Sequence, residues 1–290
     1  MKFLFALFAL GVAGLAHADI VVRDDAGNDV HLAGPAQRII SLAPNLAELT
    51  YAAGAGEKLV GTVDFSDYPE AAKKVPRIGN YASFDIENII AAKPDLVLVW
   101  QSGNAAASIE QMRKLKLPLL IVEPKGLDDI PRNLERIGML AGTQTQANAA
   151  ARDFRQRLTA LQSRYPGRKP VRMFYEIWDK PLMTVNGQQI ISDVMRLCGG
   201  ENVFANLNSL APIISVEAVL AANPDVIVTG GMGTRNASWL EPWKKWPQLK
   251  ATARGNLFFI DPDLLQRETP RLLEGAEQLC KVLDQARQSN

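Results

Sequence analysis

Three aromatic residues in the first third of the chain lie in loops that follow runs of leucine and β-branched residues. Phe65 stands in FSDYPE, Tyr81 in IGNYAS, and Trp100 ends DLVLVW, before QSGN. Ligands of open α/β sheets bind outside the carboxyl ends of the strands, which is where these loops fall. Flat apolar rings suit a large, flat, mostly uncharged ligand, so we interpret the three as binding residues. The alternative is that they cap a hydrophobic core.

Residues that could catalyse a reaction are scarce. Beyond the N-terminal apolar segment, the one remaining histidine is His31, in a polar stretch. The sequence has no Gly-x-Ser-x-Gly motif, no phosphate loop of the form Gly-x-x-x-x-Gly-Lys and no zinc-type histidine pair. The sequence therefore disfavours an enzyme, and we expect no catalytic residue, no metal site and no cofactor.

Short strand-like runs alternate with helical patterns on both sides of a long polar stretch. The expected strands are 38–44, 58–63, 95–100, 117–123, 171–178, 225–230 and 256–261. The expected helices between them are 45–55, 86–93, 188–198 and 216–222, with a further helix at the C-terminus that carries Cys280. This alternation predicts an α/β protein with two similar lobes, each a mainly parallel sheet flanked by helices, and a ligand cleft between the lobes.

A single long helix is predicted to join the lobes. Residues 144–164 contain no Pro or Gly, and apolar residues such as Phe154 and Leu158 recur there at helical spacing. Tyr165-Pro166-Gly167 then ends the pattern. The expected divisions are a signal peptide at 1–18, an N-terminal lobe at 19–125, a bridging segment at 126–168 and a C-terminal lobe at 169–290.

One segment of the sequence occurs twice. Residues 87–100 read ENIIAAKPDLVLVW, and residues 217–230 read EAVLAANPDVIVTG. We interpret the repeat as the same helix-then-strand unit in each lobe, with chance similarity between two such units as the alternative. Each copy opens with an acid, Glu87 or Glu217, which would stabilise the dipole at the start of a helix.

The N-terminal segment MKFLFALFALGVAGLAHA predicts export. Lys2 precedes an apolar run that ends in Ala16-His17-Ala18, a small-x-small pattern typical of signal peptidase sites. The run is short for a hydrocarbon core of about 30 Å, although a membrane anchor is the alternative. We expect the mature chain to begin near Asp19 and to be soluble in the periplasm.

The charge balance gives no sign of a polyanionic partner. The chain has 32 basic and 31 acidic side chains, so the loss of Lys2 would leave the two equal in number. Neither nucleic acid nor a lipid surface would attract such a protein electrostatically. We expect a monomer that does not insert into a membrane.

The two cysteines, Cys198 and Cys280, predict a disulfide, because an even number of cysteines in an exported chain favours pairing. Two buried free thiols are the alternative.

Three longer segments resemble a known family. They are VGTVDFSDYPEAAKKVPRIGNYASFDIENIIAAKPDLVLVW, MRLCGGENVF and ISVEAVLAANPDVIV, and the likeness runs from about Arg38 to Cys280. The segments are similar to those of the periplasmic cobalamin-binding proteins of the BtuF type, the soluble receptors of ABC importers for the vitamin. The SDYP and CGGEN segments and a Cys198–Cys280 pair are narrower signals than the two-lobed plan. The resemblance implies a receptor for cobalamin or a related corrinoid, held in the cleft.

The resemblance also implies which residues contact the ligand. Phe65, Tyr81 and Trp100 match aromatics that face the ligand in the family, with Phe65 where Tyr is typical and Tyr81 where Trp is typical. Met183 and Ala211 match two further aromatics, so the second lobe departs from the pattern there. A methionine thioether can still pack against a ring system. The residues expected to supply the missing wall, or else to pack the lobe, are Trp178, Trp239, Trp243 and Trp246.

The resemblance gives Glu87 and Glu217 a second role. In the family, glutamates at these positions, one on each lobe, dock onto arginines of the membrane permease. Two carboxylates on separate lobes suit a two-fold symmetric partner, and exposed ion pairs contribute orientation and association rate more than affinity.

Two other functions remain open from the sequence. One is a receptor for haem or a siderophore, in which the Tyr81 phenolate would be an axial haem ligand. The other is an exported hydrolase, which the missing nucleophile motif disfavours.

Overall fold

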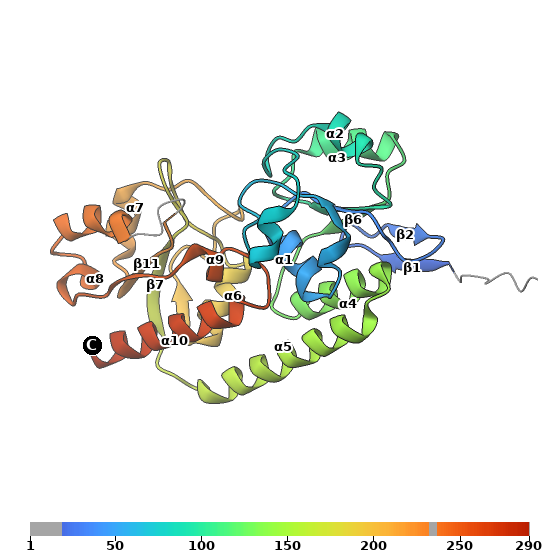
Figure 1. Cartoon of the computed structure of the whole chain (residues 1–290). Coiled ribbons are helices and arrows are strands. Elements are labelled where there is room, and N and C mark those ends of the chain that lie inside the picture. The colour runs from blue at the N-terminus through green and yellow to red at the C-terminus, as the bar shows by residue number, and fades with distance from the viewer. Residues whose placement is uncertain (1–18, 232–236, 290) are drawn as a thin grey trace, which may run out of the picture.

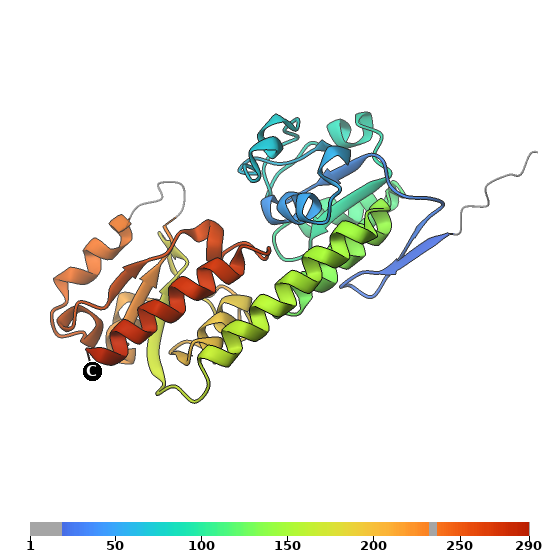
Figure 2. The same ribbon diagram turned by 60° about the horizontal axis from the view of Figure 1, so that its bottom comes forward.

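The computed structural model describes residues 19–231 and 237–289, which form two lobes side by side (Figure 1). The predicted signal peptide lies outside the described residues. Helix α5 (Gln144–Arg164) begins under the first lobe and ends under the second, as Figure 2 shows along its whole length. The arrangement confirms the predicted fold of two α/β lobes joined by one long helix.

The sheet of the first lobe is parallel, with the strand order β4-β3-β5-β6. Its strands are β3 (Ile39–Ser41), β4 (Leu59–Gly61), β5 (Leu96–Trp100) and β6 (Leu119–Val122). Its helices are α1 (Pro44–Ala52), η1 (Gly56–Lys58), η2 (Glu70–Lys74), α2 (Ile86–Ala91), α3 (Ala106–Lys114) and α4 (Asp129–Ala141). An antiparallel hairpin of β1 (Ile20–Arg23) and β2 (Asp29–Leu32) precedes the sheet and packs on α4.

The sheet of the second lobe is also parallel, with the order β10-β7-β11-β12. Its strands are β7 (Val171–Glu176), β10 (Gly200–Asn202), β11 (Val226–Thr229) and β12 (Leu257–Phe259), and a small hairpin contains β8 (Trp178–Asp179) and β9 (Leu182–Met183). Its helices are α6 (Ile190–Leu197), α7 (Val216–Ala222), η3 (Ala237–Lys245), α8 (Lys250–Ala253), α9 (Pro262–Leu265) and α10 (Leu272–Gln288).

The two sheets share one topology. In each of them, the first strand along the chain lies between the second and the third. The repeated sequence occupies matching places in the two lobes, because α2 leads into β5 and α7 leads into β11, the third strand of each sheet. In each sheet, the second strand along the chain is added on one side of the first strand, and the later strands are added on the other side. The point beside β3 or β7 where the order of strands reverses is a switch point, and α/β sheets bind ligands at such points.

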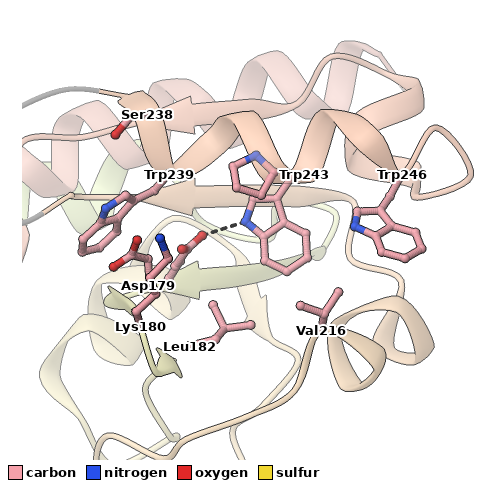
Figure 3. Close-up of a pocket in the computed structure, with 10 residues that line it drawn as sticks. Asp179, Lys180, Leu182, Val216, Ser238, Trp239, Trp243 and Trp246 are labelled. Atoms are coloured by element: carbon pink, nitrogen blue, oxygen red, sulfur yellow. Dashed lines mark hydrogen bonds between the residues drawn. The ribbon is translucent and has the colours of Figure 1, made fainter.

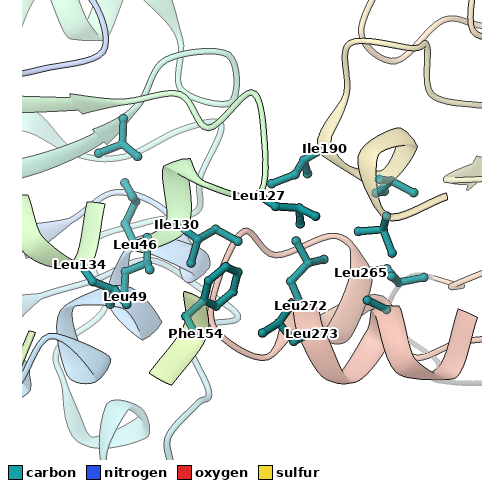
Figure 4. Packing of buried hydrophobic residues seen from close by; sticks show 14 of the residues in the cluster. Leu46, Leu49, Leu127, Ile130, Leu134, Phe154, Ile190, Leu265, Leu272 and Leu273 are labelled. Atoms are coloured by element: carbon teal, nitrogen blue, oxygen red, sulfur yellow. The ribbon is translucent and has the colours of Figure 1, made fainter. Parts of the chain in front are cut away.

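One hydrophobic cluster runs through both lobes (Figure 4). It joins Leu46 and Leu49 of α1 to Phe154 of α5 and to Leu272 of α10. Each of these side chains is at most 1% exposed. The lobes therefore share a core and are not two independent domains on a flexible tether.

Buried polar groups join the lobes beside this core. Glu48 of α1, 2% exposed, accepts hydrogen bonds from Thr269 Oγ1 at 2.7 Å and from Arg271 Nε at 2.7 Å. Asn45 Nδ2 donates to Glu268 at 2.7 Å. Burial raises the pKa of Glu268 to about 7, against the opposing effect of its hydrogen bonds. A buried charge is stable only with partners, so these residues select one relative placement of the lobes.

The predicted disulfide is confirmed. Cys198, which caps α6, bonds to Cys280 of α10, and both residues are fully buried. The two lie 82 positions apart, and closing a loop of that length stabilises the fold by about 4 kcal/mol in the chain-entropy model.

A substitution at Glu48 tests the lobe junction. We expect Glu48→Gln to lower the free energy of unfolding by about 3 kcal/mol, because it leaves the Arg271 guanidinium poorly compensated in a buried place. Urea denaturation measures the change. The matched control is Glu135→Gln, which removes the partner of Arg155 at a surface ion pair and is expected to cost under about 1 kcal/mol. Equal losses in the two variants would contradict the role of the junction.

Candidate functional site

Tyr81 and Trp100 form a ring pair at the carboxyl end of β5. Trp100 is the last residue of the strand, and Tyr81 lies in the loop between Gly79 and Phe84, which are bridged to each other. The ring centroids are 6.4 Å apart with the planes tilted by 50°. Tyr81 is 37% exposed and Trp100 is partly buried, so the pair presents apolar surface at the edge of the sheet.

Asn104 fixes the backbone of both aromatic residues. Its side chain is buried, its Nδ2 donates to Tyr81 O at 2.7 Å and to Leu42 O at 2.9 Å, and its Oδ1 accepts from Trp100 N at 2.8 Å. One amide therefore ties the Tyr81 loop to the ends of two neighbouring strands. The sequence analysis did not identify Asn104, although it stands in the QSGN segment directly after the strand.

Gly103 allows the Trp100 ring to lie against the loop backbone. A Cβ atom at position 103 would stand 1.8 Å from Trp100 Cε3, which no packing can accommodate. The ring orientation thus depends on a glycine at this position.

Phe65 lies at the boundary with the second lobe, which its backbone carbonyl contacts. Its side chain is 60% exposed, and its backbone is in the left-handed region with φ of 64°, an uncommon conformation for a bulky residue. Its carbonyl accepts a hydrogen bond at 3.1 Å from Arg267 Nη2 of the second lobe. Such strain persists where surrounding contacts enforce it, and it often marks functional segments. Among the described residues, no ring contact joins Phe65 to the Tyr81–Trp100 pair.

Arg267 is a polar group at the lobe boundary that the sequence analysis missed. Besides Phe65 O, it pairs with Asp263 at 2.9 Å and lies 3.9 Å from Glu48. Its Nη1 atom is buried and makes no hydrogen bond within the described residues. The i, i+4 spacing of Asp263 and Arg267 after a strand was visible in the sequence, but their meeting with the first lobe was not.

Met183 lies on the β8–β9 hairpin of the second lobe. It stands opposite Trp178 on β8, and an isolated antiparallel bridge joins it to Ile213. Ala211, partly buried, lies just before this segment. The exposed apolar residues around them are Trp178, Leu207, Leu210 and Ile213, the last of these 67% exposed. The second lobe thus offers an apolar surface, mostly aliphatic but including Trp178, near the two positions where aromatic residues were expected.

Three tryptophans, Trp239 and Trp243 of η3 and Trp246 just after it, have different surroundings. Trp243 is buried, and its ring meets Phe174 edge to face at 5.5 Å, so it packs the lobe. Trp239 and Trp246 are partly exposed and line a pocket within the second lobe (Figure 3). Trp239 also meets Trp178 edge to face at 6.0 Å.

Glu87 and Glu217 occupy equivalent places. Each is the second residue of a short helix, α2 or α7, and each is exposed. Asp85 caps α2, and Ser215 caps α7. Hydrogen bonds from its own backbone N–H and from the Ser215 hydroxyl lower the pKa of Glu217. Neither carboxylate forms an ion pair within residues 19–231 and 237–289, so both are available to a partner.

Metal-binding clusters and membrane-spanning helices are both absent from the described residues. No three His, Cys, Asp or Glu side chains come together there in a way that could hold a metal ion. No helix in these residues has the length and apolar character needed to cross a membrane.

The fold and the site together define the class of the protein. Two α/β lobes joined by one long helix, with aromatic residues at strand ends, are typical of a receptor that binds a small molecule. The sequence matches the model of the family described as periplasmic binding protein over residues 39–264, and the chain belongs to that family. The family consists of binding proteins, so the chain is not an enzyme and the hydrolase alternative is wrong.

Its relatives agree with the resemblance seen in the sequence. The chain is 36% identical over 247 residues to a vitamin B12-binding protein of Vibrio parahaemolyticus, covering 85% of this chain and 89% of the relative. It is 37% identical over 252 residues to a vitamin B12-binding protein of Yersinia pestis, covering 86% of each.

Solved structures share the fold of this chain. The vitamin B12 binding protein BtuF of Vibrio cholerae is similar with a TM-score of 0.81 at 37% identity, covering 87% of this chain and 98% of that one. The heme-binding protein RhuT from Roseiflexus is similar with a TM-score of 0.75 at 22% identity, covering 86% and 98%, and this likeness shows the fold alone.

Removing the Asn104 side chain tests how the ring pair is positioned. We expect Asn104→Ala to lower stability by about 2 kcal/mol, because buried backbone groups of Leu42, Tyr81 and Trp100 lose their partner. The near-ultraviolet circular dichroism of the aromatic rings should fall as the pair loosens. The control is Asn88→Ala, on an exposed helix surface, with a change under about 0.5 kcal/mol. An unchanged aromatic signal in folded Asn104→Ala would show that other contacts hold the rings.

Proposed function

We propose that this protein binds cobalamin or a related corrinoid between its lobes and delivers it to the permease of a cognate ABC importer. The observation that carries the proposal is the Tyr81–Trp100 pair, fixed by Asn104 at the carboxyl end of β5. Relatives named as vitamin B12-binding proteins, at 36% and 37% identity over most of the chain, support the same ligand.

The chemistry of a corrinoid suits these residues. Its macrocycle is broad and apolar on its faces, which matches the rings of Phe65, Tyr81 and Trp100 on one side and Met183 with the neighbouring Ala211 on the other. Its rim carries amide groups, which can donate and accept hydrogen bonds with polar groups at the lobe boundary. The ligand is a transported cargo, and we assign the protein no resident cofactor.

Delivery to the permease would use Glu87 and Glu217. Both carboxylates are exposed and lie at equivalent positions on separate lobes. Figure 1 shows α2 and α7 on the side of the molecule away from α5, so one partner surface could meet both. Charges in such contacts steer association and fix orientation more than they add affinity.

The proposed setting is the periplasm. We propose that the N-terminal segment directs export and is removed near Ala18, and that the mature protein acts there as a soluble monomer. The proposal includes no nucleic acid and no insertion into the membrane.

The choice of ligand is tested by titrating the purified protein with cyanocobalamin and with haemin, followed by absorption spectroscopy. The proposal expects saturable binding of cyanocobalamin at one site per chain. Preferential binding of haemin, with a shifted Soret band, would replace the corrinoid by haem and would direct attention to the Tyr81 hydroxyl as its ligand.

The docking role is tested by replacing both acids. We expect Glu87→Ala with Glu217→Ala to leave the fold and the cobalamin affinity unchanged while uptake into cells falls by about tenfold or more, because the contacts lie outside the cleft. Each single substitution should reduce uptake less than the pair does, and Lys at both positions should reduce uptake more than Ala at both. Radiolabelled cobalamin uptake measures the difference.

The matched control for docking is Glu70→Ala with Glu274→Ala. These exposed acids also stand in the first turn of helices, one on each lobe, but not at the repeated positions. If the control and the Glu87/Glu217 variant both show wild-type uptake, the docking role is wrong. The two acids would then only stabilise the starts of their helices.

A further inference from the structure

A pocket lies inside the C-terminal lobe. Its volume is about 400 Å³, and it opens between η3 and the β8–β9 hairpin (Figure 3). Every residue that lines it belongs to the second lobe. Asp179 and Leu182, which are paired on the hairpin, line it, whereas Met183 and Ala211 do not. The pocket is therefore separate from the surface assigned to the corrinoid.

The pocket begins at the end of the central strand of the sheet. Glu176 is the last residue of β7 and stands beside Thr229, the last residue of β11. These strands flank the switch point of the second sheet, the position where α/β folds bind ligands. The Thr229 hydroxyl is buried there and makes no hydrogen bond within the described residues.

Glu176 places an acid at the inner end of the pocket. It is 3% exposed, and one of its carboxylate oxygens accepts a hydrogen bond at 2.7 Å from Trp243 Nε1. The pKa of Glu176 is raised to about 7, because burial, with a smaller contribution from the nearby Asp179, outweighs the lowering effect of the Trp243 hydrogen bond. No basic side chain pairs with Glu176 within the described residues. A cation that reached this buried acid would stabilise its charged form.

Aromatic rings form the walls around this acid. Trp239, Trp243 and Trp246 all line the pocket, and Figure 3 shows their indole groups in a row above Leu182 and Val216. The face of an indole attracts a cation, most strongly when both are removed from water. Lys180 also lines the pocket, but it is exposed and its ammonium pairs with neither Glu176 nor Asp179 in the described structure.

We propose that this pocket is a second ligand site, which takes a small organic ammonium ion between the tryptophan rings and the Glu176 carboxylate. The rings would cover the apolar groups around the nitrogen, and Glu176 and Asp179 would supply the opposite charge. The proposal does not depend on the corrinoid, since none of the residues assigned to the corrinoid lines this pocket.

The test uses choline as the probe and its uncharged carbon analogue, dimethylbutanol, as the matched control ligand. Calorimetry and tryptophan fluorescence on the mature protein should show saturable choline binding, with the alcohol weaker by about tenfold or more because it lacks the charge. Equal binding of the two probes, or no saturable choline binding, overturns the proposal.

Two variants locate the site. Glu176→Gln keeps an acceptor for Trp243 Nε1 and removes the charge, so the fold is retained while choline binding should fall by about tenfold. Trp239→Leu removes a partly exposed ring and should weaken choline binding as well. Trp100→Ala, in the other lobe, should bind choline like the wild type. Wild-type choline affinity in folded Glu176→Gln would refute the site, whatever the outcome for cobalamin.

Discussion

The structure depends on a buried polar junction between the lobes. Glu48 and Glu268 come from different lobes, and each finds its partners across the boundary, Glu48 with Thr269 and Arg271, and Glu268 with Asn45. A carboxylate removed from water is costly unless its partners are in place, so a sliding or rotation of one lobe would expose or unpair several groups at once. The shared hydrophobic cluster and α5 also oppose movement of one lobe against the other.

The junction sets the place of the candidate site. Arg267 precedes the junction residues of the second lobe and holds the carbonyl of Phe65, so the same short segment that locks the lobes also orients the Phe65 loop. The Tyr81–Trp100 pair is fixed separately, by Asn104 and by the space that Gly103 leaves for the ring. A receptor built in this way presents a preformed surface to a flat ligand, which reduces the entropy lost on binding.

Much of the fold could be predicted from sequence because strand and helix patterns are local. The buried run LVLVW of β5, the Pro-free stretch of α5 and the repeat at Glu87 and Glu217 all appear where they were expected. Helix α4 was not identified, since Pro131 and Gly138 interrupt its pattern. Gly138 instead lets α4 approach α5 closely, as a Cβ there would stand 2.2 Å from Ala147 Cβ.

The site was only partly predictable. The rule that ligands lie at strand ends located Tyr81 and Trp100, but Asn104 and Arg267 act through contacts with residues up to 202 positions away, which no local pattern contains.

The central claim, that the fixed ring at the end of β5 holds the ligand, is tested most directly by calorimetry of cyanocobalamin with wild type and Trp100→Ala. The account predicts a loss of about 1 to 3 kcal/mol in binding free energy, and unchanged affinity in the folded variant would contradict it.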